Sequence, residues 1–399
     1  MTKSSVRWAI FFANIGHTLT HLMMLLYPTV VLTLEMQLKL GYGTLMWLSV
    51  PGLVLYGLAA LPAGWLGDRW SAEHMMVLFF MGSGAAGLAT GLAQGPVGIT
   101  GGLAAIGFFG AIYHPVGTAW LVRHAENRGR MLGWNGIFGS LGVGAGPIAA
   151  AALSSFYGWR AAFLVPGAIC LLLGAALLVL VRGGSVVAAK TDVKPQAEPA
   201  SGDVRRAFAL LSVTMLSTGI VFQALTSVLP KLFEIRLADL TAGGLIGTGG
   251  MVSLVFALSA AFQYFGGMAA DRFSMKRIYV MCWAIEVPVL FLATRLFAMP
   301  LFAAALFCFS LIAISTPTEN ALLAHYTPSR WRATAFGAKF LLSLGVSALG
   351  VPLVAVVYDR TRDFVWLFAI LGLLAALVAG TALFLPRERP APEALAPAE

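Results

Sequence analysis

Apolar residues occur along this chain in twelve long runs, separated by short segments that carry charged residues, glycine and proline. A helix needs about 20 apolar residues to cross the hydrocarbon core of a bilayer, and each run is close to that length. Backbone in contact with lipid must satisfy its own hydrogen bonds, so the runs are expected to be helices and not strands. The predicted spans are 8–33, 43–66, 75–93, 97–122, 131–155, 159–181, 208–230, 243–267, 278–297, 300–324, 333–357 and 364–385. The pattern predicts an all-α membrane protein with twelve transmembrane helices.

The composition agrees with this prediction and excludes an ordinary soluble domain, because 59% of the residues are hydrophobic and only 11% are charged. The first run is too long for a signal-peptide core and has no evident cleavage site, so it is expected to be retained. Three cysteines, Cys170, Cys282 and Cys308, all lie inside apolar runs. They provide neither a disulfide framework nor a metal-ligand spacing.

The net charge of +9 is explained by its distribution along the chain. With the N-terminus placed in the cytoplasm, most of the 26 Lys and Arg residues fall in segments on the cytoplasmic side. Short cytoplasmic loops of membrane proteins carry such an excess of Lys and Arg. We therefore expect both termini in the cytoplasm, and no nucleic acid is needed to explain the basic balance.

A short polar signature occurs twice, as Gly64-Trp-Leu-Gly-Asp68-Arg69 and as Gly267-Met-Ala-Ala-Asp271-Arg272. Further pairs recur at nearly the same spacing, such as His114-Pro115 with Thr316-Pro317. Several pairs at one spacing predict two related six-helix halves in parallel orientation, with a pseudo-twofold axis along the membrane normal.

Between the halves, at residues 182–206, the composition changes to include Gly, Ser, Lys, Pro, Gln and Glu. This composition cannot bury apolar surface, so it predicts a flexible cytoplasmic linker. The predicted organisation is an N-terminal bundle at 1–181, the linker, a C-terminal bundle at 207–385 and a cytoplasmic tail at 386–399.

Over essentially its whole length, the sequence resembles the major facilitator superfamily of transporters. The Gly64–Asp68–Arg69 turn is similar to the most specific loop motif of that family, and the stretch Gly142-Val-Gly-Ala-Gly146-Pro147 resembles its antiporter motif. The run Tyr113-His114-Pro115 is similar to the fosmidomycin-resistance-type branch. The resemblance implies a multi-pass protein of the bacterial inner membrane.

The resemblance also implies a gate latch on the cytoplasmic side. Asp68 would meet the start of the eleventh helix near Arg332, and Asp271 would meet the start of the fifth helix near Arg130. These contacts would join the two halves and break when the cytoplasmic side opens. The latch residues are Gly64, Asp68, Arg69, Arg130, Gly267, Asp271, Arg272 and Arg332. In the fifth helix, Gly142 and Gly146 form a glycine face with Gly136 and Gly139 that permits close helix packing, and Pro147 interrupts a backbone hydrogen bond there.

Ionisable groups inside membrane spans are functional candidates because they are costly to bury. His17 and His21 lie one turn apart on one helix face, with Asn14 one turn before them. The resemblance implies that the first, fourth, seventh and tenth helices line a central cavity. The predicted substrate and proton cavity contains Asn14, His17, His21, Tyr113, His114, Gln223, Glu319, Asn320 and Lys339. Histidine titrates near neutral pH and therefore suits proton coupling or anion binding, although a packed structural role stays open.

Glu319 and Lys339 are expected at similar depth on consecutive helices, where a salt bridge would lower the cost of burying either one. Such a pair is either static or switched by protonation. Two histidines four residues apart can also share a metal ion, but no Cys or acidic residue on that helix supports one, so no metal site is predicted.

The function predicted from these observations is secondary active transport by alternating access. No phosphate-binding loop of the Gly-x-x-x-x-Gly-Lys-Ser/Thr type occurs in the sequence, which indicates an ion gradient as the energy source. Proton-coupled efflux of a small organic solute or drug is favoured, and proton-coupled uptake of a small organic anion is the alternative. A non-transporting sensor of the same fold also stays open. No catalytic constellation or cofactor motif indicates an enzyme, and the expected form is a monomer without cofactors.

Overall fold

The computed structural model describes residues 3–124, 128–186, 201–242, 244–328 and 332–386, without the side chains of residues 3, 128–129, 201–203, 270–271 and 332–334. All regular elements within these residues are helices. The first six predicted spans correspond to α1 (Lys3–Leu25), α2 (Tyr27–Leu38), α3 (Tyr42–Trp47), α4 (Val50–Leu58), α5 (Ala60–Arg69), α6 (Ala72–Leu92), α7 (Pro96–Gly110), η1 (Tyr113–Gly117), α8 (Thr118–His124), α9 (Arg128–Tyr157) and α10 (Ala161–Arg182). The last six correspond to α11 (Ser201–Arg236), α12 (Leu245–Arg272), α13 (Met275–Ala293), α14 (Ala298–Tyr326), α15 (Arg332–Phe340), η3 (Leu341–Gly345), η4 (Val346–Leu349), α16 (Gly350–Thr361) and α17 (Val365–Leu383).

Eleven of the twelve predicted spans are helices, or runs of consecutive helices, that are long and apolar enough to cross a membrane in the described chain. The remaining span, predicted at 278–297, is α13, which begins at Met275. It carries Lys276 and Arg277 in its first turn and Glu286 near its middle, and these charges lower its apolar character. The twelve-helix prediction is confirmed, and α13 differs from the other spans by carrying these three charged residues.

Several spans are interrupted where the sequence places proline. The first helix breaks at Leu26, restarts as α2 with Pro28 in its first turn, and continues to Leu38, beyond the predicted end at residue 33. In the fourth span, the five-residue turn η1 is a wide π-helix that contains Pro115. Proline lacks the N–H that an α-helix requires and clashes with the carbonyl one turn earlier, so the helix widens there.

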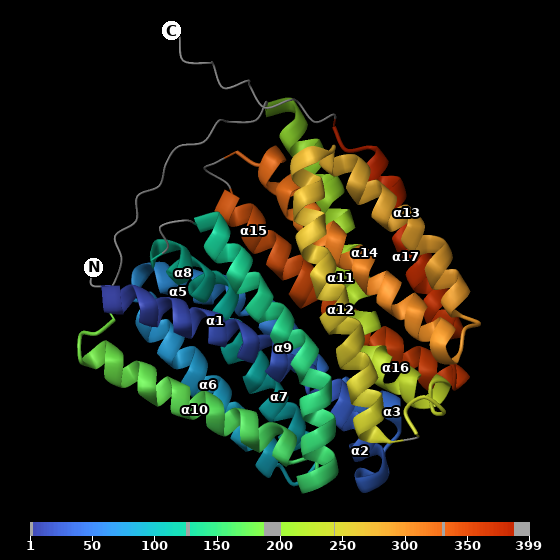
Figure 1. Ribbon diagram of the computed structural model, residues 1–399, viewed down its shortest axis with the longest axis horizontal. Helices are drawn as coiled ribbons and strands as arrows, with labels where there is room; N and C mark the ends of the chain where they lie inside the picture. Colours follow the sequence, from blue (N-terminus) through green and yellow to red (C-terminus); the bar gives the residue numbers. More distant parts are fainter. Residues whose placement is uncertain (1–2, 125–127, 187–200, 243, 329–331, 387–399) are drawn as a thin grey trace.

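The first six spans pack on one side of the molecule and the last six on the other, as two bundles that lie against each other (Figure 1). Each bundle encloses large buried side chains, such as Phe79 and Trp120 in the first and Tyr279 and Trp283 in the second. The predicted linker at 182–206 falls largely outside the described residues.

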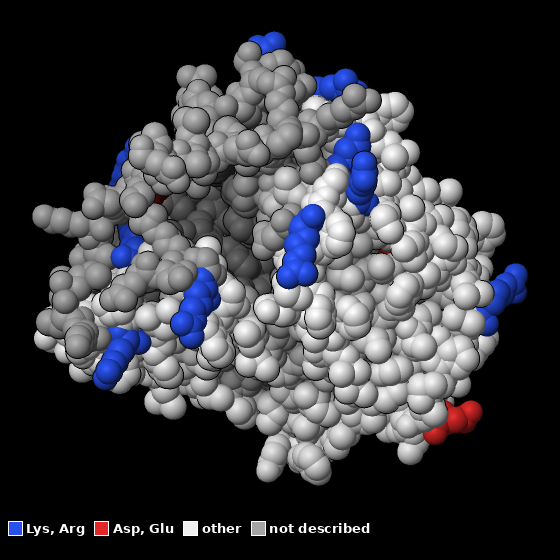
Figure 2. Space-filling view, turned by 45° about the horizontal axis from the view of Figure 1, so that its top comes forward, with Lys and Arg blue, Asp and Glu red and all other residues white. Residues whose placement is uncertain are grey.

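Arginines mark one end of the bundles, which we call the basic end. Arg69, Arg123, Arg182 and Arg272 lie in the last turns of α5, α8, α10 and α12. Figure 2 shows this end with its Lys and Arg side chains standing around a hollow. This arrangement is consistent with the prediction that the loops on one side of the membrane carry most of the positive charge.

At the opposite end the two halves are in close contact. Lys231 of α11 forms a salt bridge of 2.7 Å with Glu35 of α2 in the other half, and a second one of 2.7 Å with Glu234 on its own helix. The backbone N–H of Gly43 donates to the Asp359 carboxylate at 3.2 Å, which joins α3 to α16. We call these contacts the outer closure.

Nearer the middle of the molecule, backbone lies against backbone. A carbon placed as Cβ on Gly57 of α4 would be 2.1 Å from Cα of Gly345 in η3. The halves can approach this closely because Gly57 lacks a side chain.

Glu35→Gln is expected to weaken the outer closure, because it removes the charge that holds Lys231 to the other half. Loss of a partly buried pair of this kind costs about 1–2 kcal/mol, which is roughly a five- to thirtyfold shift in a two-state equilibrium. The measurement is the labelling rate of a Ser227→Cys reporter by a thiol reagent in lipid nanodiscs. Ser227 is 1% exposed and its carbonyl accepts from Tyr42 across the halves at 3.3 Å, and the three native cysteines are buried.

Glu234→Gln is the matched control, because Glu234 pairs with Lys231 within one helix and does not join the halves. It should leave the labelling rate close to that of the unmodified protein. Equal rates in the two variants would show that the Glu35 pair does not hold the closure.

Candidate functional site

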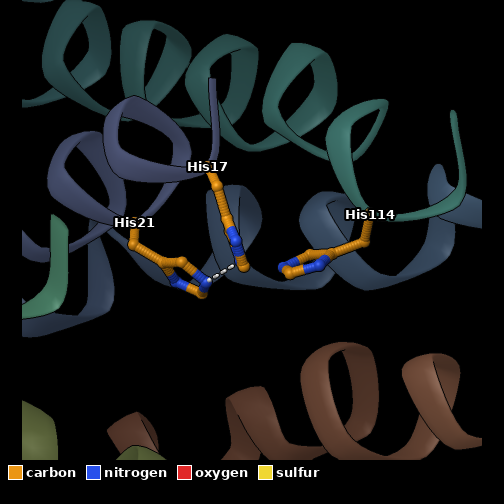
Figure 3. A group of neighbouring side chains, drawn as sticks. All are labelled: His17, His21 and His114. Atoms are coloured by element: carbon orange, nitrogen blue, oxygen red, sulfur yellow. Dashed lines mark hydrogen bonds between the residues drawn. The ribbon is translucent and has the colours of Figure 1, made fainter. Parts of the chain in front are cut away.

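Three histidines meet between the two bundles. His17 and His21 lie one turn apart on α1, and His114 lies on η1 of the fourth span. Their rings face one another in Figure 3, with His17 and His21 joined at 3.2 Å between their Nε2 atoms. The ring centroid of His114 is 5.5 Å from that of His17 and 5.3 Å from that of His21. All three side chains are half-buried. We call them the histidine cluster.

The wide turn η1 orients this cluster. Tyr113 stacks on His17 with ring centroids 4.8 Å apart, and its hydroxyl donates to the backbone carbonyl of Ala13 at 2.8 Å. Tyr113 is fully buried, while the next residue, His114, is half-buried. The turn therefore anchors α1 with one side chain and presents an imidazole with the next.

Asn135 of α9 holds the cluster from the other side, and the sequence analysis did not identify it. Its backbone carbonyl accepts a hydrogen bond from Nδ1 of His17 at 2.7 Å, and its side-chain amide donates to Asn14 at 2.9 Å. Since a carbonyl only accepts, we assign the hydrogen of His17 to Nδ1, and its Nε2 is left to face His21. A sequence signal existed, because Asn135 lies one turn before Gly139 on the glycine face of this helix.

The glycine face brings α9 against α1. A side-chain carbon on Gly139 would lie 2.6 Å from the His17 ring, and one on Gly142 would lie 2.1 Å from the carbonyl oxygen of Thr18. Gly146 is placed against Leu25, whereas Gly136 has no atom within 4 Å of its Cβ position. The helix continues through Pro147. Three of the four glycines are therefore packing positions, and Gly136 faces open space.

A second cluster contains the predicted pair of Glu319 and Lys339. The Lys339 ammonium lies 2.7 Å from Oε1 of Glu319 and donates to Asn320 Oδ1 at 2.6 Å. The other carboxylate oxygen, Oε2, accepts from the hydroxyl of Tyr279 at 2.7 Å and from that of Thr218 at 3.3 Å. Glu319 is 6% exposed and Lys339 is 7% exposed. This is a buried ion pair whose oxygens are all hydrogen-bonded, as a stable buried pair requires.

The two clusters meet at α15. Phe340, the residue after Lys339, stacks on His114 with ring centroids 5.5 Å apart and an interplanar angle of 21°. Consecutive side chains of one helix thus contact the ion pair in the second half and the histidine cluster in the first. The hydroxyl of Tyr56 adds a hydrogen-bonding group close by, because its ring lies 6.0 Å from that of His114.

Gln223 lies apart from both clusters. Its amide donates to Ser227 at 3.3 Å, and it lines a cavity of about 30 Å³ with Met23, Leu103 and Ile106. The prediction that it shares one space with the histidines and Glu319 has no direct contact to support it among the described residues.

The family model of the Major Facilitator Superfamily matches residues 10–258 and 239–399 of this chain. The chain belongs to the major facilitator superfamily. It is therefore a multi-pass integral membrane transporter, and this family membership speaks against an enzyme. Its sequence is 31% identical over 151 residues to an uncharacterised MFS-type transporter of Mycobacterium tuberculosis. That match spans 37% of this chain and 26% of the relative, so it covers about a quarter of the relative's length.

Solved structures of transporters share the fold of this superfamily member. A POT family transporter in complex with 5-aminolevulinic acid has a TM-score of 0.75 at 15% identity, with 94% of each chain covered. A D-xylose–proton symporter has a TM-score of 0.73 at 13% identity, covering 96% of this chain and 98% of that one. A bacterial homologue of the human lysosomal transporter Spinster, inward-facing and occupied, has a TM-score of 0.73 at 14% identity, covering 96% and 95%.

In this superfamily member, the first copy of the loop motif supports the histidine cluster. A carbon on Gly64 would be 3.1 Å from Pro115, and one on Gly67 would be 2.7 Å from Val116, so α5 packs directly on η1. In the second copy, Gly267 has nothing within 4 Å of its Cβ position. The two copies of the signature therefore differ in packing as well as in flanking sequence.

The charged members of the signature are placed as follows. Asp68 forms a 3.0 Å salt bridge with Arg123 of α8, in the same half, and its side chain is 73% exposed. Arg69 lies 4.3 Å above the Trp65 ring, and Arg130 and Arg272 are exposed at helix ends. The side chains of Asp271 and Arg332 lie outside the described residues. The cytoplasmic latch between the halves therefore stays a prediction. The contacts of the outer closure, in contrast, do join the two halves in the described part of the chain.

Proposed function

We propose that this transporter couples export of a small organic solute to proton entry, with Glu319 as the proton acceptor. The observation that carries the proposal is the buried ion pair of Glu319 and Lys339, in which Lys339, Tyr279 and Thr218 all contact one carboxylate. An ionisable pair in the interior of a membrane protein is costly, and such groups commonly mark proton and substrate pathways.

Protonation of Glu319 would neutralise the carboxylate and end its Coulomb attraction to Lys339. The bonds from Tyr279 and Thr218, which suit an anionic acceptor, would weaken at the same time. Because Glu319 lies on α14 and Lys339 on α15, the proton would loosen two neighbouring helices. Phe340 follows Lys339 and stacks on His114, so this loosening would reach the contact between the halves.

We infer that the basic end faces the cytoplasm, because cytoplasmic loops carry the excess of Lys and Arg. The outer closure then seals the external side, and the hollow of Figure 2 opens inward. Alternating access would reverse this state by separating Glu35 from Lys231.

Export is supported by the glycine-rich α9, whose Gly142–Pro147 stretch resembles the antiporter motif and packs directly on α1. Uptake of a small organic anion with a proton is the second candidate, and Lys339 is the observation that favours it. Once Glu319 is protonated, the Lys339 ammonium would be free to bind an anion. One solved structure that shares this fold is a D-xylose–proton symporter, so the fold is compatible with transport coupled to protons in that direction.

Transport in proteoliposomes with an imposed pH gradient tests the proposal. A panel of drugs and organic acids identifies a solute, and the direction of its movement against the proton gradient separates export from uptake. Glu319→Gln is expected to abolish accumulation driven by the pH gradient, while exchange of labelled for unlabelled solute continues. A transporter without its proton acceptor cannot use the pH gradient to accumulate solute. It can still exchange solute across the membrane by alternating access.

Glu286→Gln is the matched control, because it makes the same change at another buried carboxyl, on α13. It should keep coupled transport. The double variant Glu319→Gln/Lys339→Gln removes both charges. It replaces the single variant in the transport assay if the unpaired Lys339 makes the single variant fold poorly. Coupled transport that persists in both Glu319 variants would contradict the assignment, and solute binding without any exchange would indicate a sensor instead.

A further inference from the structure

We propose that His17, His21 and His114 bind a divalent first-row transition metal ion where the first half of the protein faces Phe340 of the second. The three imidazoles come from two spans that are distant in sequence, and their ligand nitrogens all lie within 4.8 Å of one another. The inference is independent of the direction and solute proposed above, because it concerns equilibrium binding by the resting protein.

The spacing of the nitrogens fits a tetrahedral site. With metal–nitrogen distances of about 2.0–2.1 Å, neighbouring ligand nitrogens in such a site lie about 3.3 Å apart. The Nε2 atoms of His17 and His21 are 3.2 Å apart. His114 completes the set after a shift of roughly 1.5 Å, within reach of a small rotation of its half-buried side chain.

The surroundings of His17 are those of a metal ligand. Ligating histidines almost always donate their second ring N–H to a carbonyl, carboxylate or water, which fixes the ring and its tautomer. Nδ1 of His17 lies 2.7 Å from the Asn135 carbonyl, and the Tyr113 ring stacks on the imidazole at 4.8 Å. The His17 ring fits against α9 because residue 139 is a glycine. A side-chain carbon on Gly139 would lie 2.6 Å from the ring. The lone pair on Nε2 is thereby held toward the other two histidines.

His21 is the ligand that must change tautomer. In the absence of a metal, its Nε2–H donates to Nε2 of His17. To ligate through Nε2, it carries its hydrogen on Nδ1 instead, so it stays neutral and no proton is released. Its described contacts are with His17 and His114, and this change therefore breaks no other bond.

The chemistry of the ligands decides the class of metal. Imidazole suits zinc, copper, nickel and iron, whereas magnesium and calcium prefer carboxylate, carbonyl and water oxygens. Among the described residues, the three rings contact Tyr56, Tyr113, Asn135, Phe340 and one another, none of which is an anion. Three neutral ligands leave a fourth position for water or an anionic group and leave the charge of the ion uncompensated. A small anion such as acetate is therefore expected to tighten binding.

The experiment uses the full chain, purified in detergent with any affinity tag removed. Co²⁺ is the probe, because a tetrahedral nitrogen site gives visible absorption bands far stronger than those of the hydrated ion. Titration should show one site per chain, and Zn²⁺ should bleach the bands. His21→Gln and His114→Gln are each expected to weaken Zn²⁺ binding by about 100-fold or more, beyond the 10- to 100-fold cost of losing an outer partner of a ligand.

The matched controls are His74→Gln on α6 and His325→Gln on α14, which lie outside the cluster. They should leave both the bands and the affinity unchanged. His21→Gln removes few contacts and is expected to stay monodisperse in gel filtration, so loss of binding there is not loss of folding. Unchanged affinity in the His21 and His114 variants, or no tetrahedral bands in the unmodified protein, would overturn the proposal. Neither result depends on the transport assay.

Discussion

Gly57→Ala is expected to force open the closed end of the protein and to raise labelling of the Ser227→Cys reporter at least about tenfold. The new methyl carbon would lie 2.1 Å from Cα of Gly345 and 2.9 Å from the carbonyl carbon of Leu344. Both are backbone atoms, so no side chain can rotate away. Overpacking of this kind costs about 1–3 kcal/mol, and 1.4 kcal/mol is already a factor of ten in an equilibrium. The two halves relieve the clash by separating, which is the motion that the alternating-access proposal requires.

Gly345→Ala is the matched control for this prediction. A carbon on Gly345 would lie 3.3 Å from Cα of Gly57, which a shift of a few tenths of an ångström would relieve, and 3.5 Å from the Leu341 side chain, which is ordinary contact. Its effect on labelling should be clearly smaller than that of Gly57→Ala. If the two alanines have the same effect, or if neither changes the labelling rate, the close approach of α4 and η3 does not control the closure.

Gly142→Ala is expected to produce the largest loss of stability among substitutions on the glycine face. Its methyl carbon would lie 2.1 Å from the carbonyl oxygen of Thr18, so α9 and α1 could not keep their present distance. We expect a loss of about 1–3 kcal/mol and a lower midpoint of thermal unfolding, measured by fluorescence-detected gel filtration after heating. Because α1 carries His17 and His21, metal binding to the histidine cluster should fall in the same variant.

Gly136→Ala tests whether this effect is specific to the packed glycines. It makes the same change on the same helix, but no atom lies within 4 Å of its Cβ position. It should be neutral or slightly stabilising, since alanine favours a helix over glycine by about 1 kcal/mol. A Gly142→Ala protein that is as stable as Gly136→Ala would contradict the packing described for this face.

The helices were largely predictable because the bilayer requires long apolar runs and lipid excludes other backbone structures. Prediction was poorer where a span is interrupted. The break at Leu26 and the wide turn at Tyr113–Gly117 follow from proline, but the degree of widening depends on what packs against the turn. Here Gly64 and Gly67 of α5 pack against it, and hydropathy contains no information on that contact.

The candidate site was predictable where residues share a helix face and unpredictable where the fold supplies a partner. His17 and His21 are four residues apart, so their proximity follows from helix geometry. The contact of His114 with them was expected only from family architecture, and the sequence alone predicted no metal site. Asn135 and Tyr279 contact the two clusters from other helices, which no spacing in the sequence reveals. The roles of all these residues in transport stay predictions.

The pairing of Lys231 has a kinetic consequence. Its ammonium binds Glu35 of the other half and Glu234 of its own helix at the same distance of 2.7 Å. In the opening proposed above, Glu35 would leave toward solvent, but the ammonium would keep Glu234 as a counter-charge throughout the movement. If Lys231 were paired with Glu35 alone, opening would leave an unpaired ammonium in a partly buried site and would cost free energy. Because Glu234 stays in place, the free-energy barrier to opening does not contain this cost. Such an exchangeable partner allows the outer closure to be firm at rest and still quick to release.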